Sequence, residues 1–287
     1  MKKSHFKTHL LFYVLITMLL ALIVWTIWGN TALMVNSITL SGNQIPSEFS
    51  GFRIAQISDL HNAEFGEENS LLLNSLSESK PDMIAITGDL VDAQHTNIDV
   101  ALSFAEKAVQ IAPVYYVTGN HEASLSQYSE LKTGLEAAGV IVLEDKAIQL
   151  EHNGGIVTLM GLSDPNFTIK SNIFDEVPAM ISTKLNELME NKAGYTILLS
   201  HRPELFDTYV SCGVDLVLSG HAHGGQFRLP LIGGLVAPNQ GFFPKYDAGL
   251  YSDGGTNMVV SRGLGNSIIP LRFNNRPEIV LVELTAD

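Results

Sequence analysis

The chain is nearly without cysteine: Cys212 is the only one among its 287 residues. An intrachain disulfide is therefore excluded, so the fold has to be held together by its hydrophobic core. A chain of this length can build such a core, and a hydrophobic content of 46 % is normal for a globular protein. The sequence also lacks internal repeats and low-complexity tracts, which argues against a solenoid or a long disordered region.

Basic residues are scarce as well, with 17 Lys and Arg against 30 Asp and Glu. Three of the lysines precede residue 10, so the rest of the chain has 14 basic and 30 acidic residues, a formal charge of −16. Such a domain has no electrostatic attraction for duplex nucleic acid or for an anionic lipid surface, and we expect no nucleic-acid partner. A small phosphorylated ligand can still bind at a locally positive site.

Charge is absent altogether from residues 10–28, which read LLFYVLITMLLALIVWTIW. Nineteen residues in a helix nearly span a hydrocarbon core of roughly 30 Å. Tyr13, Trp25 and Trp28 lie toward the two ends, where aromatic side chains suit the membrane interface. The run therefore predicts one transmembrane helix.

The basic residues around this run orient it. Lysines stand only on its N-terminal side, and the next Lys or Arg after it is Arg53. By the positive-inside rule, residues 1–9 form a short cytoplasmic N-terminus, 10–28 an anchor in the cell membrane, and 29–287 a domain outside the cytoplasm. A cleaved signal peptide and a buried core helix are the alternatives. A signal segment is usually shorter, about 7–15 apolar residues, and residues 29–35 contain no clear A-x-A site.

After the anchor, short apolar runs alternate with amphipathic segments, which predicts an α/β fold with buried sheets. The second half is richer in strands, so we expect two mixed sheets with helices outside, in one domain. The predicted strands are 52–58, 82–87, 114–118, 140–143, 147–151, 156–161, 195–200, 215–219, 257–261 and 278–284. The predicted helices are 69–79, 99–111, 126–139 and one near 180–191.

Five of these strands end in polar residues that can bind metal or transfer a proton. In open α/β sheets, the carboxyl edge of the strands is where ligands bind. Each residue alone has an ordinary explanation, because Asp and Asn form turns and a strand-end His is usually a surface residue. Five coincident strand ends, holding five of the nine histidines, favour a common site. Its candidate residues are Asp59, His61, Asp89, Asp92, Asn120, His121, His201, His221 and His223.

Two aspartates, one asparagine and four of the histidines suit Zn, Mn or Fe, but seven ligands are too many for one ion. They fit two divalent ions that share one bridging carboxylate. Two such ions about 3.5–4 Å apart can hold both an attacking oxygen and a phosphoryl oxygen. The glycines Gly220, Gly224 and Gly225 around the two last histidines are expected to keep backbone bulk clear and to allow positive φ.

The blocks DLH (59–61), GDLVD (88–92), GNHE (119–122), His201 and GHAH (220–223) occur in order over residues 59–223. As a set they resemble the calcineurin-like metallophosphoesterase superfamily. The extended GHAHGGQFRLP, the N-terminal anchor and the tail at 261–284 are similar to a membrane-associated bacterial phosphodiesterase branch. Ala222 stands where that branch often has Thr, at a position that does not bind metal.

The resemblance implies a four-layer α-β-β-α sandwich and a division of the ligands. One ion would be held by Asp59, His61 and His223, and the other by Asn120, His201 and His221. Asp89 would bridge them. His121 would be the general acid that protonates the leaving oxygen, and Asp92 would orient it.

The predicted activity is hydrolysis of a phosphoester by a hydroxide that bridges the two ions, with no covalent enzyme intermediate. Three arginines near glycine-rich loops are candidates for gripping the anionic substrate, although a surface role is equally compatible: Arg228, Arg262 and Arg272. The anchor favours a phosphodiester or pyrophosphate of a lipid or cell-envelope intermediate. A phosphomonoesterase and a non-catalytic metal-binding scaffold are the alternatives, and no protein partner is implied.

Overall fold

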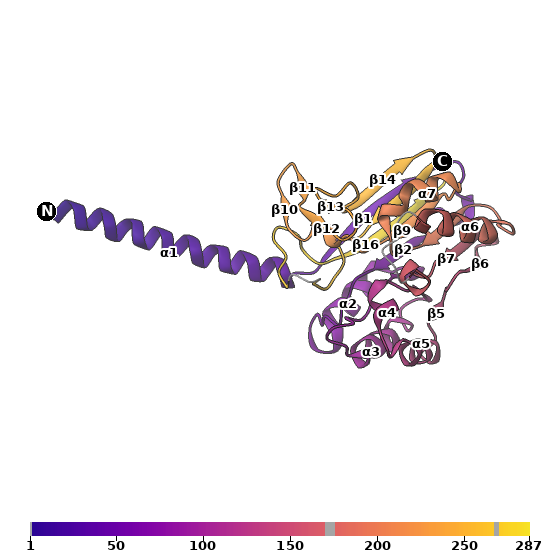
Figure 1. The fold of residues 1–287 in the computed structure, drawn as a ribbon, viewed down its shortest axis with the longest axis horizontal. Helices are drawn as coiled ribbons and strands as arrows, with labels where there is room; N and C mark the ends of the chain where they lie inside the picture. The colour runs from indigo at the N-terminus through magenta and orange to yellow at the C-terminus, as the bar shows by residue number, and fades with distance from the viewer. Residues whose placement is uncertain (1, 170–175, 267–269) are drawn as a thin grey trace.

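A computed structural model describes residues 2–169, 176–266 and 270–287, with side chains from residue 9 onward. Two six-stranded sheets form the centre of the domain (Figure 1). The first has the order β1 (Met34–Ser41), β16 (Glu278–Thr285), β2 (Arg53–Ile57), β3 (Met83–Thr87), β4 (Val114–Val117) and β5 (Ile141–Val142). The second has the order β14 (Gly249–Asp253), β15 (Thr256–Val260), β9 (Leu216–Ser219), β8 (Thr196–Leu199), β7 (Gly155–Gly161) and β6 (Lys146–His152).

Strand direction makes both sheets mixed. β2, β3, β4 and β5 are parallel to one another, as are β7, β8, β9 and β15. Antiparallel pairs occur at β16 with β2, β14 with β15 and β6 with β7. The parallel strands of each sheet therefore present their carboxyl ends at one edge, as the sequence predicts for the site.

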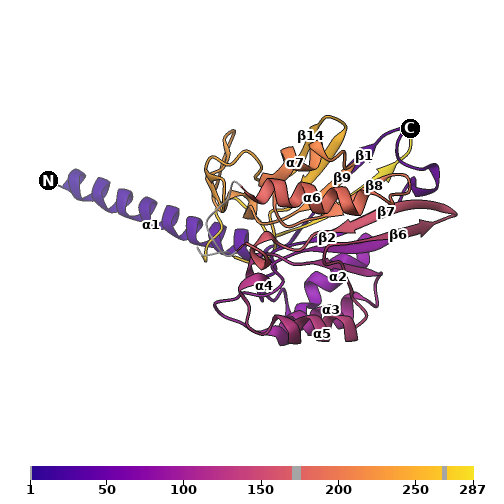
Figure 2. The same ribbon diagram turned by 45° about the vertical axis from the view of Figure 1, so that its right-hand side comes forward.

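Helices cover the outer face of each sheet, so the domain is a four-layer α-β-β-α sandwich and the predicted fold class is confirmed. Figure 2 shows the first sheet with its helices below and the second with its helices above. The first layer contains α2 (Ser70–Ser79), α3 (Ile98–Ala108) and α5 (Tyr128–Ala137). The fourth contains α6 (Val177–Met189) and α7 (Phe206–Ser211). The one-turn α4 (Asn120–Ser124) follows β4 at the site edge.

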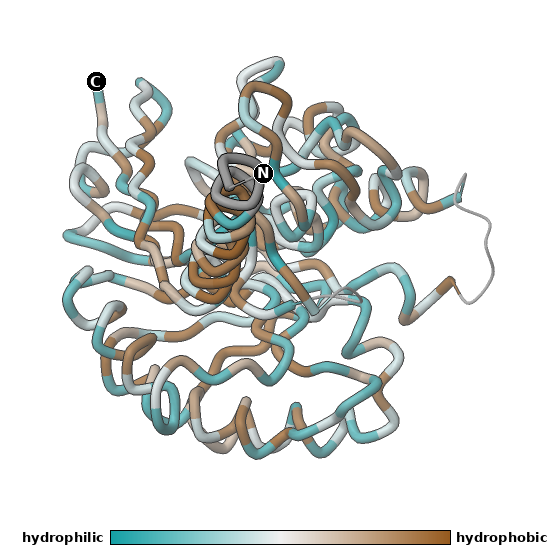
Figure 3. The backbone as a smooth tube through the Cα atoms, turned by 90° about the vertical axis from the view of Figure 1, so that its left-hand side faces the viewer, coloured by the Kyte–Doolittle hydropathy of each residue, from teal (hydrophilic) through white to brown (hydrophobic). Residues whose placement is uncertain are grey.

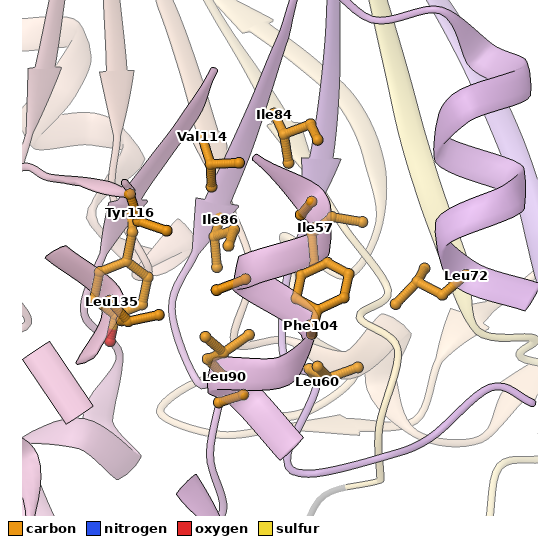
Figure 4. Packing of buried hydrophobic residues seen from close by; sticks show 14 of the residues in the cluster. Ile57, Leu60, Leu72, Ile84, Ile86, Leu90, Phe104, Val114, Tyr116 and Leu135 are labelled. Carbon is orange, nitrogen blue, oxygen red and sulfur yellow. The ribbon is translucent and has the colours of Figure 1, made fainter. Parts of the chain in front are cut away.

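Three apolar clusters fill the spaces between the layers. In the cluster of Figure 4, Phe104 from α3 and Leu72 from α2 pack on Ile57 and Ile86 of the first sheet. A second cluster lies between the two sheets and a third under α6 and α7. Strands β3, β4, β8 and β9 are buried at every residue, because both faces are covered. This explains why they read as continuous apolar runs.

The sequence analysis missed several elements. β1 alternates exposed and half-buried residues, and it is stabilised by parallel pairing with β16, whose residues lie more than 240 positions away. Helix α7 has only six residues, too few for a helical period to show. Four two-residue strands form two small hairpins beside the site: β10 (Arg228–Leu229), β11 (Gly233–Gly234), β12 (Val236–Ala237) and β13 (Gly241–Phe242).

Helix α1 (Lys2–Thr31) projects from the domain as a single rod (Figures 1 and 3). Residues His9–Thr31 are long and apolar enough to cross a membrane, and no residue of the apolar 18-residue window within this span is buried in the domain. The alternative of a core helix is therefore wrong. A helix of 30 residues is about 45 Å long.

Candidate metal centre

The carboxyl ends of β2, β3, β4, β8 and β9 meet at one edge and bring most of the predicted site residues together. Among the described residues, three groups each bring their possible ligand atoms within 4.8 Å of one another. They are Asp59, His61 and His223; His61, Asp89 and His121; and Asp89, His201 and His221. Because the first sheet supplies the aspartates and the second supplies three of the histidines, the site exists only where the two sheets pack together.

Asp89 lies between the groups. Its Oδ2 atom is 3.1 Å from His201 Nε2 and 3.6 Å from His61 Nε2. His221 Nδ1 is 3.1 Å from His201 Nε2, so one side of Asp89 faces two imidazoles that come from different strands. On the other side, His61 Nε2 lies 3.2 Å from His223 Nε2. One carboxylate oxygen is thus shared by two imidazole groups.

Asp59 completes the group with His61 and His223, and its Oδ1 atom lies 3.3 Å from His223 Nε2 and 3.9 Å from His61 Nε2. Both of its oxygens also accept the backbone N–H of His221, at 3.1 Å. The Asp59 carboxylate therefore fixes the start of the turn that carries both late histidines. It is fully buried, as are most of the ligands.

The backbone of the site is strained in a consistent way. Five of the candidate residues have φ between 46° and 67°, a left-handed conformation that costs about 1–3 kcal/mol for a residue with a Cβ. They are Asp59, His61, Asp89, His221 and His223. Gly224 and Gly225 also have positive φ, as the sequence predicts. A Cβ on Gly220 would collide with Ser58 Oγ.

Burial keeps three of the imidazoles neutral and therefore able to bind metal. Desolvation lowers the pKa of His61 to about 4. Desolvation also lowers the pKa of His221 and of His223 well below the ordinary value, reinforced by the positive charges of Arg202 and Arg272. His201 differs: although burial opposes its charge, the carboxylates of Asp89 and Asp59 raise its pKa to about 10.

The residues present fit a metal centre. The side-chain oxygen of Asn120 is buried without a hydrogen-bond partner among the described residues. Two pairs of imidazole nitrogens face each other at 3.1 and 3.2 Å around a shared carboxylate. Buried nitrogens and oxygens of this kind are costly unless paired, and imidazole with carboxylate is a donor set for divalent transition metals.

His121 stands at the rim, half-buried, with its ring 4.4 Å from the ring of His61. Its backbone N–H donates to Asp89 Oδ1 at 2.8 Å. Its Nδ1 atom accepts the backbone N–H of Ala93 at 3.1 Å and lies 3.6 Å from Asp92 Oδ1. Asp92 is therefore in ion-pair range of His121 without a hydrogen bond to it, and the Asp92 carboxylate accepts the backbone N–H of Gln94 at 2.7 Å.

The three candidate arginines have different surroundings. Arg228 Nη1 donates to Asp247 Oδ2 and to the Gly224 carbonyl, both at 2.9 Å. Arg272 is 1 % exposed, and its guanidinium donates to the carbonyls of Gly265 and Arg262. Arg262 is partly exposed, and its Nε atom lies 3.6 Å from Glu278 Oε2.

Sequence reasoning missed the role of Glu122. Its buried carboxylate accepts four backbone N–H groups: those of Gly119, Asp89, Leu90 and Val91, at 2.7–3.3 Å. It thereby ties the loop after β3 to the loop after β4. Desolvation and the neighbouring Asp89 charge raise its pKa to about 7, against the opposing effect of the N–H donors. The only sequence signal was its place in GNHE.

Arg202 was missed as well, although it directly follows His201. It is buried and forms a two-point ion pair with Asp164, with N–O distances of 2.5 and 2.9 Å. Its third nitrogen, Nη1, lies 3.0 Å from His221 Nε2. Arg202 also lines a pocket of about 420 Å³ beside the site. The described residues of its lining are Pro165, Asn166, Val177, Pro178, Arg202, Glu204, Leu205 and Asn239.

The end of α1 is bonded to the same neighbourhood. The Asn30 side chain accepts the backbone N–H of Arg272 at 2.7 Å and donates to its carbonyl at 2.8 Å. Arg272 Nη2 in turn lies 3.5 Å from His223 Nδ1. Arg276 donates to the carbonyls just after the helix and stacks on Trp28, 4.6 Å from its ring centre. Segment 272–276 therefore connects the helix end to a candidate ligand.

Comparisons with known proteins agree with this geometry. Residues 52–225 match the family model described as calcineurin-like phosphoesterase. The chain is 30 % identical to the uncharacterized metallophosphoesterase YkuE of Bacillus subtilis, over 86 % of this chain and 83 % of that one. It is 30 % identical to the phosphodiesterase YaeI of Escherichia coli, over 81 % and 82 %.

The fold resembles the crystal structure of TT1561 of Thermus thermophilus, with a TM-score of 0.52 and 15 % identity over 75 % of this chain and 91 % of that one. The family match covers more than half of the sequence and includes every strand end that contributes to the site. The chain therefore belongs to the calcineurin-like phosphoesterases and is a metal-dependent phosphoester hydrolase.

Proposed function

We propose that the chain is a membrane-anchored phosphodiesterase that hydrolyses a phosphodiester or pyrophosphate of a lipid or another cell-envelope molecule. The observation that carries this proposal is the Asp89 carboxylate, which lies between His61 and His201 at the junction of the two sheets. Support for a diester comes from the name of the Escherichia coli relative, and support for a lipid comes from the bonds between the α1 end and the site.

The residues suit two divalent ions of Mn, Zn or Fe. Asp59, His61 and His223 would hold one, and Asn120, His201 and His221 the other, with Asp89 shared between them. When bound, such ions supply Lewis acidity and lower the pKa of a bound water toward neutrality. The chain's own contribution is the preset position of the ligands, which left-handed backbone and buried hydrogen bonds maintain.

His121 supplies the proton for the departing oxygen. Because Ala93 donates its backbone N–H to His121 Nδ1, a neutral ring carries its own proton on Nε2. The Asp92 carboxylate lies 3.6 Å from the same Nδ1 atom, and its proposed role is to orient the ring so that Nε2 faces the departing oxygen.

Of the three arginines, Arg262 is the one we propose to contact the substrate, since it is partly exposed at the glycine-rich edge. Arg228 donates to Asp247 and Arg272 to the Gly265 carbonyl, so we propose that these two arginines stabilise loops instead. The pocket beside Arg202 offers space for the group attached to the phosphate.

The lysines that precede the apolar span of α1 support an orientation with the catalytic domain outside the cytoplasm. A domain fixed to the outer surface of the cell membrane meets lipid phosphoesters and envelope intermediates there. No nucleic-acid substrate is expected from its charge.

Substrate class is tested with the full-length protein in detergent and in nanodiscs, loaded with Mn²⁺ or Zn²⁺. The panel contains bis-p-nitrophenyl phosphate, p-nitrophenyl phosphate, a phosphatidylglycerol and a lipid pyrophosphate. We expect the diester to be hydrolysed faster than the monoester, and one of the lipids to be hydrolysed in nanodiscs. Faster turnover of the monoester would make the protein a phosphomonoesterase instead.

The role of His121 is tested by His121→Ala, with His95→Ala as the matched control. His95 also lies 3.6 Å from Asp92, but it is exposed. We expect His121→Ala to retain its metal and to lose about 10²–10⁴-fold in kcat on an alkyl diester. The loss should shrink on an aryl diester, whose leaving group is stable without a proton. Loss of metal, or equal losses on both esters, would show that His121 is not the acid.

A further inference from the structure

Residues 229–244, LPLIGGLVAPNQGFFP, contain no ionisable side chain. This absence is notable in a domain with a formal charge of −16. The segment is not buried: Leu231 is 108 % exposed and Phe242 79 %. Ile232 and Phe243 are also among the exposed large hydrophobic residues. Four large apolar side chains thus meet solvent in sixteen residues, which is the property of a contact surface.

The two hairpins hold these side chains outward. The β10–β11 turn contains Leu231 and Ile232, and β13 ends at Phe242. Leu231 and Phe243 have φ of 67° and 56°, a left-handed conformation that is unfavourable for bulky residues. Strain of this kind persists only where the surroundings impose it, and it concentrates at functional positions.

Polar contacts fix the base of the hairpins. Asp247 Oδ2 accepts the backbone N–H of Gly234 at 2.6 Å and Arg228 Nη1 at 2.9 Å. The Leu235 N–H donates to the carbonyls of Phe227 and Gly225, and the Phe243 N–H donates to the Leu235 carbonyl at 2.8 Å. The exposed side chains are therefore presented by an ordered support that also touches the site turn at Gly225.

The hairpins and the end of α1 are attached to the same segment, 272–276. The Arg228 N–H donates to the Phe273 carbonyl at 3.0 Å, and the Asn274 side chain donates to the Arg228 carbonyl. On its other side this segment binds Asn30 and stacks on Trp28. Figures 1 and 2 agree that β10 to β13 lie on the side of the domain from which α1 projects.

We propose that Leu231, Ile232, Phe242 and Phe243 insert into the surface of the bilayer that α1 crosses, as a second membrane contact. This proposal rests on the anchor of the proposed function. The bilayer is the occupant because the apolar helix and the hairpins share one support and one side of the domain. Aromatic and aliphatic side chains suit the interface, and a charge-free contact does not need anionic lipid.

This second membrane contact determines the position of the metal site relative to the bilayer surface. A single helix leaves a domain free to tilt, whereas a second contact fixes the carboxyl edge of both sheets against the headgroups. The turn that contains His223 and Gly225 then lies directly behind the inserted hairpins. A phosphoester that remains in the membrane can reach the site without leaving it, so the substrate class is a membrane-resident lipid phosphoester.

The contact is tested in the full-length chain by fluorescence quenching. The parent protein carries Cys212→Ser and has no cysteine. Three variants of it each contain one introduced cysteine: Leu231→Cys, Phe242→Cys or Asn191→Cys. Each is labelled with nitrobenzoxadiazole and placed in phosphatidylcholine nanodiscs with or without doxyl-labelled phosphatidylcholine. Asn191 is the control, because it is exposed between α6 and β8, at the sheet edge opposite the site.

We expect at least twofold quenching at positions 231 and 242, none at 191, and no dependence on added phosphatidylglycerol. Absence of quenching at either hairpin position overturns the proposal. A spectral blue shift without lipid quenching also overturns the proposal. If that blue shift grows with protein concentration, it identifies a second copy of the chain as the occupant of this surface.

Hydrogen exchange of the unlabelled protein repeats the test without substitutions. We expect residues 229–244 to exchange more slowly in nanodiscs than in detergent, and equal exchange in the two would overturn the proposal.

The native tryptophans separate this proposal from the anchor itself. Trp25 and Trp28 are the only two in the chain, and both lie in α1. If doxyl lipid quenches them in the unlabelled parent while the hairpin probes stay bright, the anchor stands and the second contact fails. If the tryptophans are not quenched, the anchor fails and the second contact fails with it. Neither reading depends on turnover of any substrate.

Discussion

His201 is the imidazole whose protonation depends most on what lies next to Asp89. His201 Nε2 is 3.1 Å from Asp89 Oδ2, and its Nδ1 atom donates to the Thr87 carbonyl at 2.8 Å. Despite burial, the two aspartates raise its pKa to about 10. A proton on His201 thus occupies the position that a cation would take. The other three imidazoles are already neutral near neutral pH.

This difference predicts proton release on metal binding. A ligand nitrogen has to be unprotonated, so at pH 8 loading the metal-free protein should release about one proton per chain, from His201. Protons are released rather than taken up because the pKa of His201 is raised. Below pH 10, His201 carries a proton before metal binds and cannot carry it on the nitrogen that binds the metal. Calorimetric titration with Zn²⁺ in two buffers of different ionisation enthalpy measures the number. His201→Ala should lower the number of released protons by about one, and identical heats in both buffers would contradict the assignment.

At this scale, the fold brings the candidate ligands named from the sequence together, whereas the residues that support them were not predicted. Asp59, Asp89 and His201 each follow a buried strand, so the topology alone brings them together. Glu122 and Arg202 belong to the same site, but their roles depend on which backbone N–H groups and which carboxylate reach them after folding. No local pattern encodes those partners.

At the scale of elements, the site depends on loops from neighbouring strands being tied together. Glu122, at the start of α4, accepts the N–H groups of three residues in the loop after β3 and of Gly119 before α4. Two loops therefore share one buried carboxylate, and Asp89 lies in the first of them.

Removing this carboxylate should loosen both loops. Glu122→Ala leaves up to four backbone donors without a partner, at about 1–3 kcal/mol for each that stays buried. We expect a lower free energy of unfolding and at least tenfold weaker metal binding, because Asp89 loses its support. Chemical denaturation and competition with a chelating dye measure the two effects. Glu130→Ala, an exposed glutamate of α5, should change neither, and an unaltered metal affinity in Glu122→Ala would show that the tie is unimportant.

The predicted strands and helices are present because buried strands read as apolar runs and helices as amphipathic ones. β1 was missed for a physical reason: it is an edge strand with one exposed face, and its partner β16 lies at the other end of the chain. The four short strands β10 to β13 were missed because they and their connecting turns contain glycine, proline and exposed apolar residues in no regular period. Their structure comes from tertiary contacts with Asp247 and Phe273.

At the scale of the whole molecule, helix α1 is connected by direct contacts to the sheet edge that carries the candidate metal site. Asn30 and Trp28 bind segment 272–276, and that segment reaches His223 through Arg272 and Asn275. β1 follows the helix after two residues and pairs along its whole length with β16. In the proposed membrane-anchored state, a helix attached in this way would turn one defined side of the domain toward the bilayer.

The side of the membrane on which the domain stands is the last prediction. Lysines precede the apolar span, and the first Lys or Arg after it is Arg53, so the domain should lie outside the cytoplasm. Protease added to intact spheroplasts should digest the domain while a cytoplasmic marker survives. A variant that reverses the charge bias, with Lys2, Lys3 and Lys7 changed to Gln and lysines placed at the exposed Thr31 and Ser37, should move part of the population to the protected side. Complete protection of the wild-type domain in spheroplasts would place it in the cytoplasm, where the same active-site edge would face the inner leaflet instead.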